Sequence, residues 1–109
     1  MSEHPVDRLY AQVLARKGGD PAKSYTAKLL NEGVSKCAKK VGEEGVEVGI
    51  AALAGTAQER VAESADLLYH LCVLWVAAGV DPNDVFAELT AREGRSGLDD
   101  KAARKGIVR

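Results

Sequence analysis

Residues 43–66 of the chain read EEGVEVGIAALAGTAQERVAESAD. Apolar residues recur at helical spacing on both sides of Gly55, and Thr56 followed three residues later by Glu59 is the sequence signature of a capping box. One helix therefore ends at the glycine and another begins directly after it. Because the connection is so short, we expect the two helices to pack antiparallel.

Acidic residues are placed symmetrically about this turn. Glu47 lies eight residues before Gly55 and Glu63 eight after it, while Glu44 and Asp66 lie eleven before and eleven after. Within each helix the two acids are three residues apart, which puts them on one face. Antiparallel packing sets both pairs at the same level. Four facing carboxylates repel strongly in a partly desolvated site, and a bound divalent cation relieves that repulsion.

The type of ligand indicates the ion. Oxygen ligands without histidine or cysteine favour a hard cation, and Mg²⁺ is the expected occupant where a phosphate completes the coordination. Two other interpretations stay open. Acids three residues apart are commonly just a solvated helix face. Di-iron helical bundles also use carboxylates, but they require a Glu-x-x-His pair on two helices, where this chain has Glu47 and Asp66 as the second members.

The remaining apolar pattern is also helical. It predicts helices from Pro5 to shortly before Gly18, from Ser24 to about Leu30, over 34–54, over 57–78, and from Pro82 onward. We find no strand pattern, internal repeat or long linker, and 109 residues are too few for two independent cores. We therefore expect an all-α fold, a small helical bundle built on the antiparallel hairpin. It forms one domain over 1–109, with a polar tail from about residue 94.

The helix predicted over 57–78 is apolar around most of its circumference. A chain of this length has too few other helices to cover it, so we expect a homodimer to complete the bundle.

Composition limits the partners of the chain. Fifteen basic and sixteen acidic residues give a net charge of −1, which provides no general attraction for nucleic acid or an anionic membrane. The amino terminus has no secretory pattern, and the uninterrupted apolar stretches are short for a bilayer, so we expect a soluble, cytoplasmic protein. Cys37 and Cys72 lie inside helical patterns without metal-binding spacing, and we interpret both as buried thiols.

One helical turn beyond the acids lie Lys40, four residues before Glu44, and His70, four residues after Asp66. With Lys36 and Lys39 nearby, a cation here would hold the phosphates that a metal bridges. The alternative is that these are ordinary surface lysines. We interpret His70 as a helix residue with no special role.

The pattern EExxE followed by ExxD resembles the all-helical, MazG-type nucleotide pyrophosphohydrolases. Four longer segments narrow the resemblance to the phosphoribosyl-ATP pyrophosphohydrolase family, and the resemblance extends over nearly the whole chain. They are SYTAKLL (24–30), KKVGEE (39–44), ESADLLYHL (63–71) and REGRSG (92–97).

This resemblance implies the second step of histidine biosynthesis, in which phosphoribosyl-ATP and water give phosphoribosyl-AMP and pyrophosphate with Mg²⁺ present. It also implies a ligand set, which consists of Glu44, Glu47, Glu63 and Asp66. Glu43 is then the candidate for orienting or deprotonating the attacking water, with an ion pair to Lys39 as the alternative. We expect five basic residues to contact the substrate phosphates: Lys28, Lys39, Lys40, Arg92 and Arg95. The basic residues Lys101, Arg104 and Lys105 are further candidates in the tail.

Two rival functions remain at this point. A housekeeping enzyme of the same superfamily would hydrolyse other nucleoside triphosphates or dUTP, although the flanking segments argue against it. A non-catalytic helical dimer would use its apolar faces to bind a partner, with the acids serving only solubility.

Overall fold

Five α-helices are present in the computed structural model, which describes residues 4–94 and 97–98. No strand occurs within those two ranges, so the all-α prediction is confirmed. The helices are α1 (Pro5–Ala15), α2 (Tyr25–Glu32), α3 (Val34–Ala54), α4 (Ala57–Ala78) and α5 (Pro82–Ala91).

The turn between α3 and α4 is held by several specific contacts. Gly55 ends α3, and a Cβ atom at this position would lie 2.9 Å from the Ala51 carbonyl oxygen, so only glycine fits without a shift. Thr56 and Glu59 form the predicted capping box at the start of α4. The Arg60 guanidinium donates to the carbonyl oxygens of Ala51 (3.2 Å) and Gly55 (2.9 Å). Together these bonds satisfy backbone groups that both helix ends would otherwise leave unpaired.

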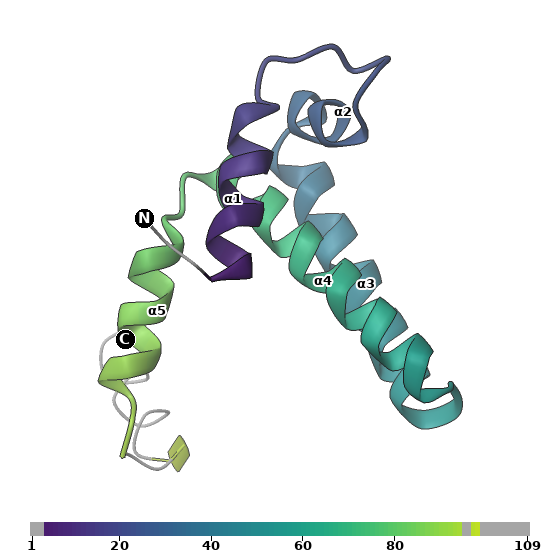
Figure 1. Ribbon diagram of the computed structural model, residues 1–109, viewed down its shortest axis with the longest axis vertical. Coiled ribbons are helices and arrows are strands. Elements are labelled where there is room, and N and C mark those ends of the chain that lie inside the picture. Colours follow the sequence, from purple (N-terminus) through teal and green to yellow (C-terminus); the bar gives the residue numbers. More distant parts are fainter. Residues whose placement is uncertain (1–3, 95–96, 99–109) are drawn as a thin grey trace.

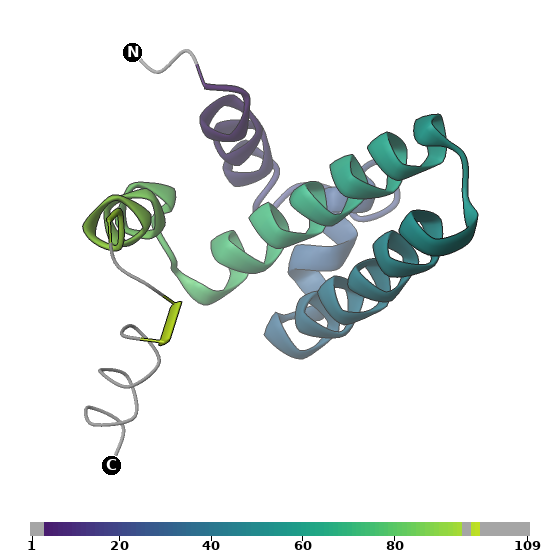
Figure 2. The same ribbon diagram turned by 90° about the horizontal axis from the view of Figure 1, so that it is seen from below.

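Helix α4 is the centre of the molecule. It packs along α3 in the antiparallel hairpin and also contacts α1 and α2 (Figures 1 and 2). The buried residues of this core come from all four helices, and those of α4 lie in its second half. They are Val13, Leu29, Cys37, Cys72, Val73 and Val76. Both cysteines are buried and free, as the sequence predicts.

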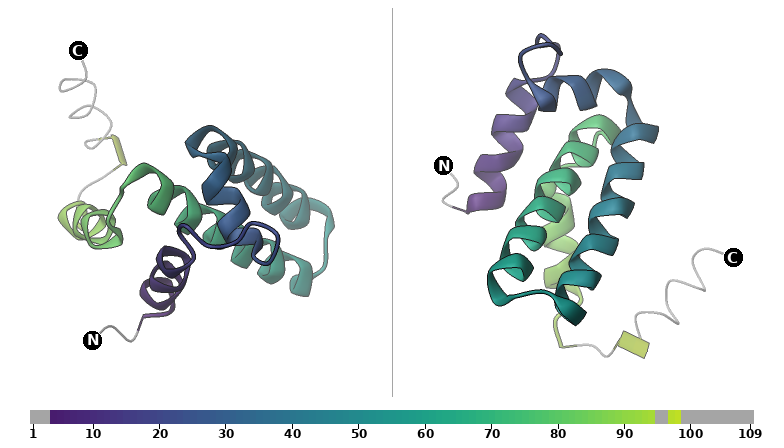
Figure 3. Two further views of the ribbon diagram at one scale, coloured as in Figure 1. Left: turned by 90° about the horizontal axis from the view of Figure 1, so that it is seen from above. Right: turned by 90° about the vertical axis from the view of Figure 1, so that its right-hand side faces the viewer.

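Helices α2 and α5, which precede and follow the hairpin in the sequence, are placed differently relative to it. Helix α2 crosses the end of the hairpin that lies opposite the turn (Figure 3). Helix α5 points away from the hairpin (Figure 1), although Phe86 in α5 contacts the ring of His4 with a centroid distance of 5.7 Å. Helix α2 therefore packs on both helices of the hairpin, whereas α5 extends away from them.

Part of α4 is left uncovered by the described residues of the chain. Val61 is 71% exposed and Leu68 is 46% exposed, and α3 exposes Val46, Ile50 and Leu53. Single exposed apolar residues are common, but several on adjoining helices mark a surface that another body covers. The expected central helix is thus present, and its outer side is open.

By length and mean hydropathy alone, α4 could also cross a membrane. Among the described residues, α4 is the one helix long and apolar enough for this. Its most apolar 18-residue stretch has a mean hydropathy of 1.4, and 22% of that stretch is buried inside the chain. The apolar residues of this stretch are interrupted by polar ones, which is why the sequence shows no long uninterrupted apolar run. The core helix of a soluble protein has the same length and composition, so this property alone does not indicate a membrane protein.

Candidate active site

Three of the predicted acids converge between α3 and α4. Glu44 of α3 and Glu63 and Asp66 of α4 each place a carboxylate oxygen within 4.8 Å of the others. Glu44 and Glu63 are half-buried, and Asp66 is exposed. The mirror spacing about Gly55 therefore does bring acids from both helices to one level. The group consists of oxygen donors alone, which suits a hard divalent cation.

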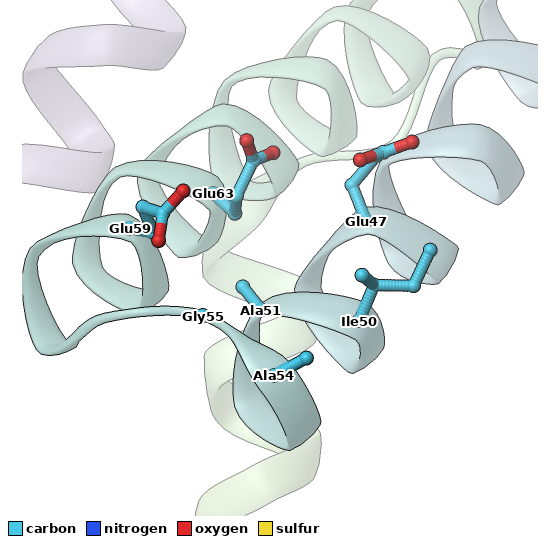
Figure 4. A pocket seen from close by; sticks show the side chains of 7 residues that line it. All are labelled: Glu47, Ile50, Ala51, Ala54, Gly55, Glu59 and Glu63. Carbon is cyan, nitrogen blue, oxygen red and sulfur yellow. The ribbon is translucent and has the colours of Figure 1, made fainter.

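Glu47 lies beside this group rather than inside it. It lines a groove of about 190 Å³ that runs from the acids to the turn, and Figure 4 shows its carboxylate on the same side of the two helices as that of Glu63. The structure thus brings three of the four predicted ligands into one close group and leaves Glu47 at its edge. The lining residues of the groove are Glu47, Ile50, Ala51, Ala54, Gly55, Glu59 and Glu63.

The acids destabilise one another electrostatically in the metal-free protein. Desolvation raises the pKa of Glu63 above its usual value, and the charges of Asp66, Glu47, Glu44 and Glu59 raise it further. A carboxyl group whose pKa is higher in the folded than in the unfolded state makes folding less favourable as it loses its proton. Charge on Glu63 therefore opposes folding at neutral pH.

Replacing Glu63 with glutamine should stabilise the metal-free protein at neutral pH. The gain should shrink as the pH falls through the carboxyl range, because the wild-type side chain then becomes neutral as well. Thermal unfolding in EDTA at several pH values measures this difference. Glu59→Gln is the matched control: its backbone bond from Thr56 lowers the pKa of Glu59, so this change should have the opposite sign. A Glu63→Gln variant less stable than wild type at neutral pH would contradict the repulsion.

Glu43 is exposed and forms an ion pair with Lys40, with the Nζ atom 3.4 Å from Oε1. Sequence reasoning offered Lys39 as the alternative partner of Glu43, and that pairing is wrong in this structure. Lys40 is partly buried and lies beside the acid group, as predicted.

In the described part of the chain, Lys28, Lys39 and Arg92 form no ion pair with the acids of the close group. Lys28 and Lys39 are exposed on α2 and α3. Arg92 ends α5 and pairs with Glu88 at 2.9 Å, on the helix that points away from the hairpin. The expectation that Arg92 reaches the substrate phosphates thus has no support from its position here. Arg95 and the tail residues Lys101, Arg104 and Lys105 lie outside the described residues.

His70 is the residue that sequence reasoning undervalued. It is 6% exposed, its Nδ1 atom is buried, and no hydrogen-bond partner for that atom occurs in the described part of the chain. Its spacing of four residues from Asp66 was visible in the sequence, but its burial under α2 was not.

Comparison with known proteins identifies the class. The sequence model of a family described as phosphoribosyl-ATP pyrophosphohydrolase matches residues 6–93. That range includes nearly all of the five helices and every acid discussed above. The all-α fold and this match together define the class, which is that of the all-helical pyrophosphohydrolases.

Curated relatives agree with this match along almost the whole chain. A phosphoribosyl-ATP pyrophosphatase of Parvibaculum lavamentivorans is 60% identical, over 91% of this chain and 91% of its own length. Those of Rhodospirillum rubrum and Azospirillum brasilense are 56% and 57% identical over 92% of this chain, and over 86% and 90% of their own lengths. The chain belongs to the phosphoribosyl-ATP pyrophosphohydrolase family. Its activity is the phosphoribosyl-ATP pyrophosphatase step of histidine biosynthesis. The resemblance drawn from the sequence motifs is confirmed.

Proposed function

We propose that this enzyme hydrolyses phosphoribosyl-ATP to phosphoribosyl-AMP and pyrophosphate with Mg²⁺ held by Glu44, Glu47, Glu63 and Asp66. The observation that carries the proposal is the convergence of three carboxylates from two helices within 4.8 Å. Glu47 at the edge of the group supplies the fourth carboxylate.

The donor set fits this ion. It contains only carboxylate oxygens, and the pKa of Glu63 is raised by desolvation and, after that, by the negative charges of the neighbouring acids, which a divalent cation would offset. Mg²⁺ typically binds through few carboxylates and fills its remaining positions with waters and substrate phosphate oxygens. When bound, the metal supplies charge neutralisation on the phosphates of the anhydride.

The side chains beside the acids account for the remaining chemistry. The water oxygen forms a bond to phosphorus, and the anhydride P–O bond breaks with its electron pair leaving on the diphosphate. Glu43 orients this water and accepts its proton, and the ion pair with Lys40 positions the Glu43 carboxylate. The Lys40 ammonium also stabilises the negative charge that develops on the leaving diphosphate.

The assay that tests the proposal offers purified enzyme phosphoribosyl-ATP, ATP and dUTP, each with Mg²⁺ or with EDTA. We expect pyrophosphate release from phosphoribosyl-ATP with Mg²⁺ and none in EDTA. Release that persists in EDTA would overturn the metal assignment. Equal release from ATP or dUTP would favour a broader nucleotide pyrophosphohydrolase.

A second part of the proposal is that the enzyme acts in the cytoplasm as a homodimer, and the open side of α4 supports the dimer. Val61 and Leu68 are seven residues apart on α4, so they share a face, and both are exposed. A second copy of this chain is the occupant that covers such a face symmetrically.

The wild-type protein should therefore have a mass in solution of about twice 11.6 kDa. Val61→Glu should reduce it to that of one chain, because a charge would be buried without a partner in the dimer while the side chain is already exposed in the monomer. Light scattering after size exclusion measures the mass, and Ala11→Glu on the exposed side of α1 is the control. A wild-type protein that elutes as a monomer at micromolar concentration would contradict the dimer.

A further inference from the structure

A second polar layer lies beyond the acid group, on the side away from the turn. It consists of Tyr25, Lys40 and His70. Glu44 and Asp66 are each eleven residues from Gly55, whereas Lys40 and His70 are each fifteen residues from it. Four residues of helix correspond to about 6 Å along the hairpin. The layer is therefore the next level of the same site.

Helix α2 closes this end of the hairpin (Figures 1 and 3). The ring of Tyr25 meets that of His70 edge to face, with a centroid distance of 6.1 Å. The hydroxyl groups of Thr26 and Tyr69 are hydrogen-bonded to each other, which fixes the first turn of α2 on α4. The partial positive charge at the amino terminus of α2 is thus held close to the second polar layer.

His70 has hydrogen-bonding capacity that the described part of the chain does not use. Its Nδ1 atom is buried and has no partner among residues 4–94 and 97–98, which is unfavourable in a folded protein and commonly indicates a site completed by a ligand or water. Burial lowers the pKa of His70, and the charges of Glu44, Lys40, Asp66 and Glu43 also act on it. The ring is therefore a neutral group next to the acids, with one N–H to donate.

Lys40 adds a positive charge at the same level. The neighbouring Tyr25, followed by Glu43 and Glu44, raises the pKa of Lys40, so it stays protonated. Its ion pair with Glu43, at 3.4 Å, engages one of the three N–H donors of the ammonium group. The other donors are available to an anion at the same level.

The opposite side of the acid group has different chemistry. The groove toward Gly55 has no basic residue in its lining, and Ile50, Ala51 and Ala54 make part of it apolar. Its carboxylates from Glu47 and Glu59 are acceptors for hydroxyl groups. Such a groove suits the base and ribose of a nucleotide, and it repels a polyphosphate.

We propose that the second polar layer binds the leaving diphosphate, so that the substrate lies along the hairpin with its diphosphate toward α2 and its nucleoside toward Gly55. This orientation rests on the proposed function, because it takes the acid group as the point where the anhydride is cleaved. Lys40 contacts the diphosphate by charge, and His70 donates a hydrogen bond to it.

Measuring the binding of each product separately tests which end of the site holds the diphosphate and which holds the nucleoside. We expect Lys40→Met and His70→Leu to weaken the binding of pyrophosphate with Mg²⁺ roughly ten- to a hundredfold, the range for losing a hydrogen bond to a charged group. Binding of phosphoribosyl-AMP should change little in both variants. Ala54→Leu, which fills the groove, should have the reverse effect. Calorimetric titration measures both ligands, and Lys17→Met is the control for loss of a surface charge.

A conservative variant distinguishes ligand binding by His70 from a purely structural role. Asparagine keeps a hydrogen-bonding group near the position of Nδ1, so His70→Asn should recover part of the pyrophosphate affinity that His70→Leu loses. Helix content and thermal midpoint confirm that each variant is folded. Equal pyrophosphate affinity in wild type and His70→Leu would remove His70 from the subsite. Loss of phosphoribosyl-AMP binding instead of pyrophosphate binding would reverse the orientation. A wild-type protein inactive with Mg²⁺ would contradict the proposed function itself.

Discussion

Replacing Glu44 with glutamine is expected to lower kcat/KM for phosphoribosyl-ATP by about a hundred- to a thousandfold, the range for losing one preorganised group that stabilises transition-state charge. Glu44 is the acid of α3 in the close group, so this change leaves the metal with ligands from α4 and the more distant Glu47. Glutamine has the same shape and a similar helix propensity, so the fold should persist. Steady-state pyrophosphate release at several Mg²⁺ concentrations measures the effect.

Glu32→Gln provides the matched control for this experiment. Glu32 is exposed at the end of α2 and lies outside the close group, so its replacement should leave kcat/KM within about twofold of wild type. Circular dichroism of both variants shows whether helix content is retained. Full activity of Glu44→Gln at limiting Mg²⁺ would remove Glu44 from the metal site.

The largest loss of stability is expected from Leu29→Ala, at about 2–5 kcal/mol. Leu29 is 1% exposed and belongs to the core cluster with Val13, Cys37 and Val73, so truncation leaves a cavity where three helices meet α2. Its carbonyl oxygen, which accepts from the Cys37 thiol at 3.4 Å, is unaffected by the change. The effect therefore reports side-chain packing.

Urea unfolding at one fixed protein concentration measures this loss, since the stability of a dimer depends on concentration. Leu14→Ala is the control, because Leu14 is half exposed on α1 and removes much less contact. If Leu29→Ala cost no more than Leu14→Ala, the core described here would be wrong at its junction with α2.

Local sequence features determined most of the fold. The capping box, the glycine at the turn and the helical spacing of apolar residues act over one or two turns, so the bounds of α3 and α4 could be predicted from the residues themselves. The antiparallel register that follows from those bounds predicted four facing acids; the structure brings Glu44, Glu63 and Asp66 into one close group, and Glu47 lies at its edge.

Features that depend on packing could not be predicted in this way. Lys39 and Lys40 are both spaced correctly to pair with Glu43, and only the side-chain conformations select Lys40. The burial of His70 depends on the contact of α2 with α4 through Tyr25, and no short-range sequence pattern predicts that contact. The ion pair of Arg92 with Glu88 could not be predicted either, since it also depends on side-chain conformation, and the role of Arg92 stays a prediction.

The close approach at Gly55 has a consequence for ion size. A Cβ atom at Gly55 would meet the carbonyl oxygen and the Cα atom of Ala51 in the last turn of α3, so a larger residue would displace that turn and, with it, the acids of α3 relative to those of α4. Mg²⁺ binds oxygen at about 2.0–2.1 Å and Ca²⁺ at about 2.3–2.6 Å, so a few tenths of an ångström between the helices decides which ionic radius the carboxylates accommodate. Replacing Gly55 is thus expected to alter the preference for Mg²⁺ over Ca²⁺ without removing any ligand.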